Sequence, residues 1–229
     1  MKLGDCVVDG IFLERPNRYL ARVLIEDKEF HAHVPDPGRL PGLMIPGRAV
    51  RLIHSPGPKR KTEYTLALVR HDAIWVSVYP VFANALVKDA LTRRSLACLA
   101  GYEEFSAEVK CGGSRFDFQL TYPDGKAFVE VKSVSLVEDT LGKFPDAPTE
   151  RGCKHLKELI DLRGEGHRAI VLFISQRSDT RRITSNDAID PKFGEWFRKA
   201  RAVGVEFYGY NCKVIPTAVS LDQPIEVVD

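Results

Sequence analysis

The chain has 229 residues, of which 44% are hydrophobic and 28% charged, and this composition indicates a folded globular protein instead of a disordered one. The formal net charge of +2 does not decide for or against a polyanionic partner, because nucleic-acid-binding proteins often gather their basic residues on one face. Five dispersed cysteines without a CxxC pair indicate neither a disulfide framework nor a zinc site. The sequence shows no signal-peptide pattern and no apolar run of ~20 residues, so we expect a cytoplasmic protein without a membrane partner.

The first eighty residues alternate short apolar segments with turn-forming residues and lack a long helical period. So many short strands in a small segment predict a closed or nearly closed barrel. A loop rich in proline and glycine, residues 35–42, interrupts them and is expected to carry function, as loops on a β scaffold often do. The strands are expected at residues 6–12, 19–25, 30–34, 49–54, 65–70 and 73–76.

Basic residues are concentrated in one part of this segment. Residues 1–82 hold 12 Lys and Arg against 9 Asp and Glu, and the stretch from Pro37 to Thr62 has no carboxylate at all. Cations without local counter-charges predict a basic surface that contacts phosphate. The predicted contacts in this stretch are Arg39, Arg48, Arg51, Lys59, Arg60 and Lys61.

The character of the chain changes near Asn84, which is expected to cap a helix over residues 84–99. Strands and helices then alternate, and this pattern predicts an α/β domain. We therefore divide the chain into residues 1–82 and 83–229 and expect the two domains to be separable. The irregular stretch 138–148 is long for a compact domain and is a candidate functional loop. The later strands are expected at 104–109, 115–121, 127–134, 169–174 and 205–210, and the helices at 149–163 and 191–202.

Three charged residues form the candidate site of this second domain. Asp117 lies on one expected strand, while Glu130 and Lys132 share a face of the next strand because side chains alternate along a strand. The turn-forming residues 122–126 join the two strands. A hairpin in which opposed residue numbers sum to 249 would place Asp117 opposite Lys132 and Gln119 opposite Glu130.

Two carboxylates and an ammonium group on one patch can support metal-dependent chemistry. Carboxylates hold hard cations such as Mg²⁺ or Mn²⁺, and a lysine can stabilise charge that develops on a phosphate. The spacing of Asp117, Glu130 and Lys132 is also that of PD-(D/E)xK nucleases. The alternative is an ordinary exposed hairpin in which Asp117 and Lys132 form a cross-strand ion pair. Against that alternative, a carboxylate between apolar strand residues usually needs a specific partner.

Several longer segments of the chain are distinctive, namely HVPDPGRL (33–40), Asn84, GYEEFSAEVKCGGSRFDF (101–118), FVEVKSVSL (128–136) and KFPDAPTERGCKHLKEL (143–159). With these segments, the chain resembles the sugar fermentation stimulation protein A family over nearly its whole length. The resemblance departs from the usual pattern at Asp36, where many family members have asparagine.

The resemblance implies an N-terminal OB-like small β-barrel, a C-terminal restriction-endonuclease-like α/β domain, and binding to DNA without marked sequence preference. It implies that Asp117, Glu130 and Lys132 form the metal and catalytic set, with Glu108 as a further metal ligand. Further contacts to nucleic acid are expected from Arg115, Arg151, Lys154 and His155, although the last three could equally belong to a solvated helix face.

Two functions follow from these residues. The first is a metal-dependent phosphodiesterase that acts on DNA or RNA. The second is a non-catalytic DNA-binding regulatory or accessory protein, linked to sugar metabolism, that keeps a nuclease-like fold. The sequence contains no helix-turn-helix with clear base-reading residues, and this argues against a sequence-specific repressor.

Overall fold

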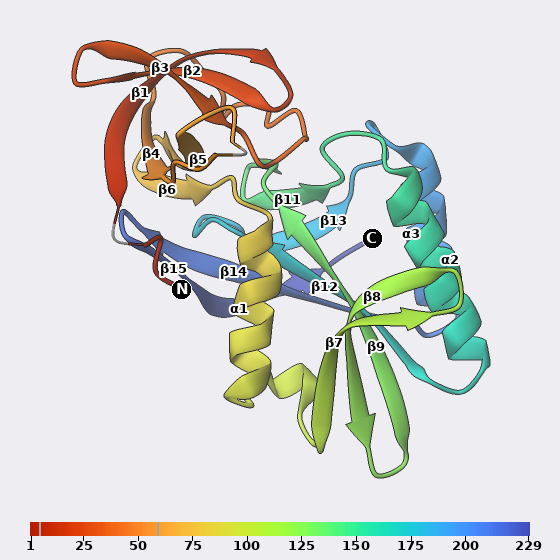
Figure 1. The fold of residues 1–229 in the computed structure, drawn as a ribbon. Coiled ribbons are helices and arrows are strands. Elements are labelled where there is room, and N and C mark those ends of the chain that lie inside the picture. The colour runs from red at the N-terminus through yellow and green to blue at the C-terminus, as the bar shows by residue number, and fades with distance from the viewer. Residues whose placement is uncertain (5, 59) are drawn as a thin grey trace.

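The computed structural model describes residues 1–4, 6–58 and 60–229, and its N-terminal part is a small β-barrel (Figure 1). Five strands form the barrel, and a parallel pairing of β3 with β5, through Ala32 and Tyr64, closes it. The sixth strand, β6, continues the sheet from β5, and the OB-like fold expected for this segment is confirmed. The strands are β1 (Val7–Asn17), β2 (Leu20–Ile25), β3 (Lys28–His33), β4 (Ala49–His54), β5 (Tyr64–His71) and β6 (Ile74–Ser77).

The second part of the chain forms a mixed nine-stranded sheet in the order β10-β11-β13-β15-β14-β12-β9-β8-β7. Helices cover both of its faces (Figure 1). Its strands are β7 (Glu104–Cys111), β8 (Ser114–Tyr122), β9 (Gly125–Val134), β10 (Val137–Glu138), β11 (Leu141–Phe144), β12 (Arg168–Ser175), β13 (Arg182–Ser185), β14 (Glu206–Ile215) and β15 (Ala218–Val227). The helices are α1 (Val81–Thr92), a short 3-10 helix (Ala97–Leu99), α2 (Glu150–Gly164) and α3 (Pro191–Ala202). Among the residues that the structure describes, no helix combines the length and apolar character needed to cross a bilayer.

Strand β12 organises this sheet because it is apolar on both faces. It runs parallel to β9 on one side and to β14 on the other. Ile170, Leu172 and Ile174 pack in the cluster that includes α1, whereas Val171 and Phe173 pack with α2 and α3. A strand buried on both faces is typical of parallel sheets covered by helices. The α/β architecture predicted for this domain is therefore confirmed.

Three expectations from the sequence need correction. The first helix begins at Val81 after Pro80 and ends at Thr92, so Asn84 lies inside the helix and is not its cap; proline is suited to a helix start because its φ is already helical. The stretch 138–148 is not wholly irregular, because β11 pairs with β13. The sequence pattern also does not predict β15, since its segment AVSLDQPIEV contains Pro224 directly after the polar pair Asp222 and Gln223.

The two parts of the chain share one hydrophobic cluster. Leu3, Ala67 and Leu68 from the N-terminal part pack with α1 and the face of the large sheet that α1 covers. The amino-terminal residues also pair with the large sheet, through a bridge from Lys2 to Ala218. The barrel keeps a separate core of its own. The structure therefore joins the two parts by burial as well as by the chain connection.

A buried polar contact adds to this junction. Gln176, at the end of β12, accepts a hydrogen bond from the Ser77 hydroxyl at 2.7 Å. Its amide group donates to the Tyr79 carbonyl at 3.1 Å and to the Ser133 hydroxyl at 2.9 Å. Buried polar groups need such partners, so these bonds fix where β6 lies on the large sheet.

The proline-glycine loop of the barrel contacts the segment that leads into α2. Asp146 accepts a hydrogen bond from the Leu40 backbone at 3.2 Å, and a Cβ atom at Gly38 would lie only 2.2 Å from its carboxylate. Arg15 ties the same loop together by donating to the carbonyls of Asp36 and Gly38, each at 2.7 Å. This close approach explains why glycine is required at position 38.

We expect Asp36→Asn to stabilise the protein at neutral pH. Burial raises the pKa of Asp36 to about 6. The hydrogen bond from the Gly38 backbone acts to lower this pKa, whereas the nearby Asp146 carboxylate raises it further. The stabilisation from protonated Asp36 is present below about pH 4 and is lost as the pH rises through about 6. Asparagine retains the acceptor for Gly38, so urea unfolding at pH 7.5 should give about 1–3 kcal/mol more stability. If the free energies of unfolding of Asp36→Asn and the wild-type protein differed by the same amount at acidic and neutral pH, this explanation would be contradicted.

The shared cluster also predicts that the domains stabilise each other. A fragment of residues 83–229 loses the packing of Leu3, Ala67 and Leu68. It should therefore unfold at a lower urea concentration than the whole chain, as followed by circular dichroism. The division at residue 82 stays a prediction. A fragment with the same midpoint as the whole chain would show that the junction contributes no stability.

Candidate functional site

The hairpin of β8 and β9 has a different register from the one expected. Gln119 pairs with Phe128 and Phe118 with Val129, so opposed residue numbers sum to 247 and not to 249. The closing pair is Tyr122 with Gly125, around a two-residue turn. Proline suits the second position of such a turn and glycine the fourth, and this explains the shift by two residues. Continued by one residue, the register places Asp117 opposite Glu130 instead of opposite Lys132.

Strand β8 separates from β9 at Asp117. The ladder ends at the pair of Phe118 with Val129, and beyond it the Asp117 carboxylate accepts a hydrogen bond from the Val131 backbone at 2.7 Å. Its second oxygen accepts from the Asn84 amide on α1 at 2.6 Å. The facing residue on β7, Glu108, has a left-handed φ of 56°, an unusual conformation for a strand residue. These features hold the Asp117 side chain at the point where the strands diverge.

Glu130 is a buried carboxylate, with 3% of its surface exposed. Its Oε1 atom accepts hydrogen bonds from Lys132 Nζ, at 2.6 Å, and from Nδ1 of His155 on α2. Its Oε2 atom is also buried, and none of the described residues donates to it. A buried oxygen without a donor is costly, so it is suited to a further electropositive partner.

The position of His155 follows from the start of α2. Thr149 caps this helix by accepting from the Gly152 backbone at 3.0 Å. Within the first turns of the helix, Arg151 Nε donates to His155 Nε2 at 3.4 Å. Because Arg can only donate, Nε2 is the acceptor and Nδ1 carries the proton that is donated to Glu130. His155 therefore acts on the carboxylate as a fixed hydrogen-bond donor.

The two carboxylates have opposite pKa shifts. Burial raises the pKa of Asp117, and the nearby charge of Glu130 raises it further. Burial also acts to raise the pKa of Glu130, but the hydrogen bond from His155 and the charge of Lys132 outweigh it, so the pKa of Glu130 lies below its usual value. Glu130 therefore stays ionised at neutral pH.

These side chains line a cavity of about 480 Å³ between α1, the hairpin and the start of α2. Glu108 reaches this cavity but forms an ion pair with Arg115 at 2.7 Å. The other lining residues with polar side chains are Asn84, Asp117, Glu130, Lys132, Ser133 and Arg151. The cavity thus combines carboxylates with cations, as a site for a metal ion and a phosphate requires.

The three metal ligands expected from the sequence do not form one cluster. Within residues 1–4, 6–58 and 60–229, no group of three or more His, Cys, Asp and Glu side chains is placed to hold a metal ion. Glu108, expected as the third ligand, lines the same cavity and forms an ion pair with Arg115, and its role as a metal ligand stays a prediction. Magnesium commonly uses one or two protein carboxylates and keeps several waters. Asp117 and Glu130, with the unpartnered Oε2 atom, fit that simpler coordination.

Nine of the ten residues predicted to contact nucleic acid fall into three groups, and the tenth is His155. The first group is exposed and consists of Arg39, Arg60, Lys61, Arg115, Arg151 and Lys154. The second is Lys59, which lies outside the described residues. Arg51 and Arg48 are partly buried and already have partners: Arg51 pairs with Asp9 at 2.7 Å, and Arg48 bonds His71 at 2.7 Å. The premise that these cations lack local counter-charges is therefore wrong for Arg51, because β1 brings Asp9 beside it.

His155 requires a further correction. The sequence predicts it on the cationic face of the helix, yet only 3% of its surface is exposed and its ring faces Glu130. Asn84 is likewise expected only as a helix cap, whereas its side chain holds Asp117. Both residues lie within the segments that carry the family resemblance, and that resemblance is the one available signal for them. Their contacts join residues 25 and 33 positions apart, so local patterns could not reveal them.

We expect His155→Ala to raise the pKa of Glu130, because it removes the hydrogen bond that favours the ionised carboxylate. Carbon-13 NMR titration of the Glu130 carboxyl measures this shift. Urea unfolding should show a loss of about 1–3 kcal/mol, since a buried acceptor loses one donor. The exposed His31→Ala serves as the control and should change neither value. An unshifted Glu130 titration would exclude the proposed action of His155.

Comparisons with known proteins match this architecture. The protein-family model described as "Sugar fermentation stimulation protein RE domain" matches residues 81–218, and the family model described as "SfsA N-terminal OB domain" matches residues 13–78. The "Sugar fermentation stimulation protein homolog" of Desulforamulus reducens is 42% identical over 222 residues, which cover 96% of this chain and 92% of that protein. The corresponding protein of Moorella thermoacetica is 41% identical over 232 residues, which cover 99% of each chain.

A solved structure is similar over its whole length. "The structure of Pyrococcus Furiosus SfsA in complex with Ca2+" superposes with a TM-score of 0.89 at 28% identity, and the match covers 100% of this chain and 98% of that one. Both family models, the full-length relatives and the shared fold lead to one conclusion. The chain belongs to the sugar fermentation stimulation protein family.

Proposed function

We propose that this protein binds nucleic acid and hydrolyses phosphodiester bonds with the help of a divalent cation. The observation that carries the proposal is the pairing of the buried, ionised Glu130, whose Oε2 atom has no donor among the described residues, with Asp117 across the hairpin. The relative from Pyrococcus furiosus is described as a complex with Ca²⁺, another hard cation that takes oxygen ligands. This supports a cation site in the same fold.

Asp117 and Glu130 would hold Mg²⁺ or Mn²⁺, and the bound cation would polarise the scissile phosphate and lower the pKa of a water molecule. Lys132 Nζ, 2.6 Å from Glu130 Oε1, would stabilise the negative charge that develops on the phosphate. Asn84 and His155 act as positioning residues, since each holds one carboxylate by a hydrogen bond.

Cations around the cavity support binding to a phosphate backbone. Arg151 lines the cavity, and the exposed Lys154 lies one turn further along the same helix. The barrel adds Arg39, which is exposed next to Leu40, where the loop contacts Asp146. Contacts of this kind carry no base preference, so we propose binding to DNA, and to RNA where its backbone fits, without marked sequence preference.

A non-catalytic DNA-binding protein is the second candidate. It is favoured by the ion pair between Glu108 and Arg115, which occupies the carboxylate expected as a third ligand. In that case Glu130, His155 and Lys132 would be a structural charge network. A buried network of this kind can persist for structural reasons alone. Measurement of metal binding separates the two candidates.

Glu130→Gln should greatly weaken Mg²⁺ and Mn²⁺ binding measured by titration calorimetry, because it removes a negative ligand while keeping the size of the side chain. Lys132→Met should leave metal binding largely intact and lower single-turnover cleavage of labelled DNA by about 10²–10³-fold. Glu195→Gln, at the exposed ion pair with Lys199 on α3, is the matched control. Absence of both metal binding and cleavage in the wild-type protein would remove the catalytic proposal and leave the second candidate.

The proposed electrostatic binding predicts a linear fall of log affinity with log salt concentration. Arg39→Gln should lower the affinity for unrelated DNA duplexes by similar factors and reduce the salt slope by about 1. Lys28→Gln, at an exposed cation where β3 begins, is the control. Fluorescence anisotropy in EDTA measures both variants. A salt slope unchanged by Arg39→Gln would show that this residue does not contact phosphate.

A further inference from the structure

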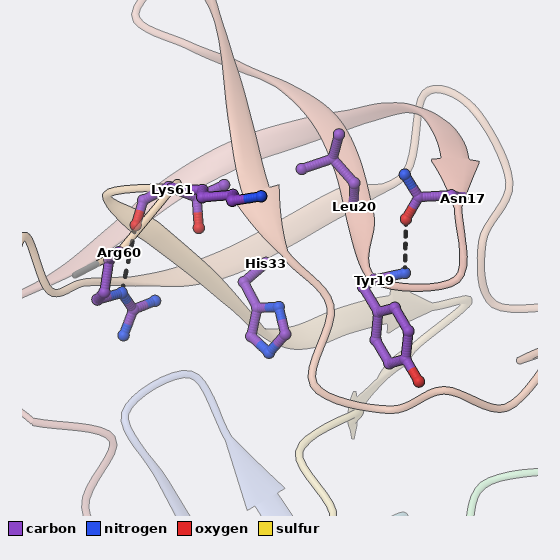
Figure 2. Close-up of a pocket in the computed structure, with 7 residues that line it drawn as sticks. Asn17, Tyr19, Leu20, His33, Arg60 and Lys61 are labelled. Atoms are coloured by element: carbon purple, nitrogen blue, oxygen red, sulfur yellow. Dashed lines mark hydrogen bonds between the residues drawn. The ribbon is translucent and has the colours of Figure 1, made fainter.

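The barrel carries a second cavity, separate from the carboxylate site and larger, at about 700 Å³. It lies between the turn that joins β1 to β2, the end of β3, and the segment that leads into β5 (Figure 2). It is lined by Asn17, Tyr19, Leu20, His33, Arg60, Lys61 and Thr62. None of these residues is a carboxylate, so this cavity is suited to an anionic ligand.

Tyr19 presents an aromatic ring to this cavity. Tyr19 is 52% exposed, so its ring is accessible to a ligand, while its backbone is fixed on both sides. The Tyr19 amide donates to Asn17 Oδ1 at 2.9 Å, a bond visible in Figure 2, and its carbonyl accepts from Val34 at 2.9 Å. A ring on a fixed turn loses little conformational entropy when a flat ligand stacks on it.

The opposite wall of the cavity supplies positive charge. Arg60 donates to the Thr65 hydroxyl at 2.5 Å and to the Thr62 carbonyl at 3.2 Å, so its guanidinium group has a defined orientation. Thr65 is itself buried and pairs with His33 across the strands that close the barrel. Lys61 beside it is exposed. In the part of the chain that the structure describes, no carboxylate forms an ion pair with Arg60 or Lys61.

We propose that this cavity binds a nucleotide of a single nucleic-acid strand, with the base stacked on Tyr19 and the phosphate held by Arg60 and Lys61. The proposal rests on the proposed function and adds to it a substrate class, a strand with unpaired bases. An aromatic ring next to cations is the arrangement by which proteins bind single strands without reading their sequence. A base inside a duplex is already stacked on its neighbours, so its face is not available to Tyr19.

The residues that line the cavity favour this occupant over a duplex. The ring and the cations come from different segments, since Tyr19 follows β1 and Arg60 precedes β5. A ligand that contacts both must therefore present a flat apolar face and a negative group at once. A nucleotide with an exposed base has both features, whereas a duplex backbone presents only phosphate and sugar to a cavity of this kind.

The test compares Tyr19→Leu with Tyr19→Phe, which keeps the aromatic face, by fluorescence anisotropy in EDTA with labelled oligo(dT), oligo(U) and a DNA duplex. Tyr19→Leu should weaken binding to single strands by about 5- to 150-fold while leaving the salt slope unchanged, because stacking releases no counterions. Tyr19→Phe should bind like the wild-type protein. Arg60→Gln with Lys61→Gln should instead flatten the slope by about 0.7 for each phosphate that the variant no longer neutralises.

Matched controls and a separate readout keep the outcomes distinct. Ile45→Ala removes another exposed apolar side chain of the barrel outside this cavity and should change nothing. Oligo(dT) and oligo(U) affinities show whether the strand is DNA, RNA or either. If Tyr19→Leu binds single strands as tightly as the wild type, or loses affinity for duplex equally, the inference is overturned. Calorimetry of Mg²⁺ binding tests the carboxylate site separately, because Tyr19→Leu should not alter it.

Discussion

The buried carboxylate of Glu130 is the feature on which the rest of the site depends. An ionised carboxylate inside a protein is tolerated only when charges and hydrogen bonds compensate for the lost water. Here two elements supply that compensation, since Lys132 follows on the same strand and His155 comes from α2. The compensation is complete for Oε1 and absent for Oε2 among the described residues. Because of this asymmetry, Glu130 Oε2 is available to an additional electropositive partner.

The requirement extends into the surrounding fold. His155 reaches Glu130 because Thr149 and Asp190 fix the start of α2: Asp190 accepts from the Thr149 backbone at 2.8 Å and also caps α3. Asp117 reaches its position because β8 separates from β9 and Asn84 approaches from α1. Each helix that flanks the site thus donates one hydrogen bond to a carboxylate, α1 to Asp117 and α2 to Glu130.

The junction between barrel and sheet places a second binding surface on the same molecule. Gln176 and the shared cluster around Leu68 join the two parts, and the Asp146 contact brings the barrel loop to the segment before α2. In the proposed function, the barrel cavity would bind unpaired nucleotides while the carboxylate site acts on the phosphodiester backbone. Division of these tasks between two connected surfaces allows binding without sequence preference and chemistry at a separate place.

The sequence by itself determined the positions of most strands and helices, because these depend on local periodicity and on turn residues. Helix α3 occupies the predicted residues 191–202, and Glu130 and Lys132 share a face as alternation along β9 requires. The choice of Asp117, Glu130 and Lys132 as a set likewise needed only their spacing and the family resemblance. The structure brings all three to one cavity.

Only the tertiary structure decided how these residues are held. The hairpin register depended on which residues of the segment 122–126 form the turn, and the sequence allowed more than one choice. The contacts of His155 and Asn84 join separate elements, and β15 is stabilised by pairing with β14 and β13 and not by its own composition. The cavity at Tyr19 forms where the barrel closes through β3 and β5. Such contacts depend on how distant segments pack, which no local pattern specifies.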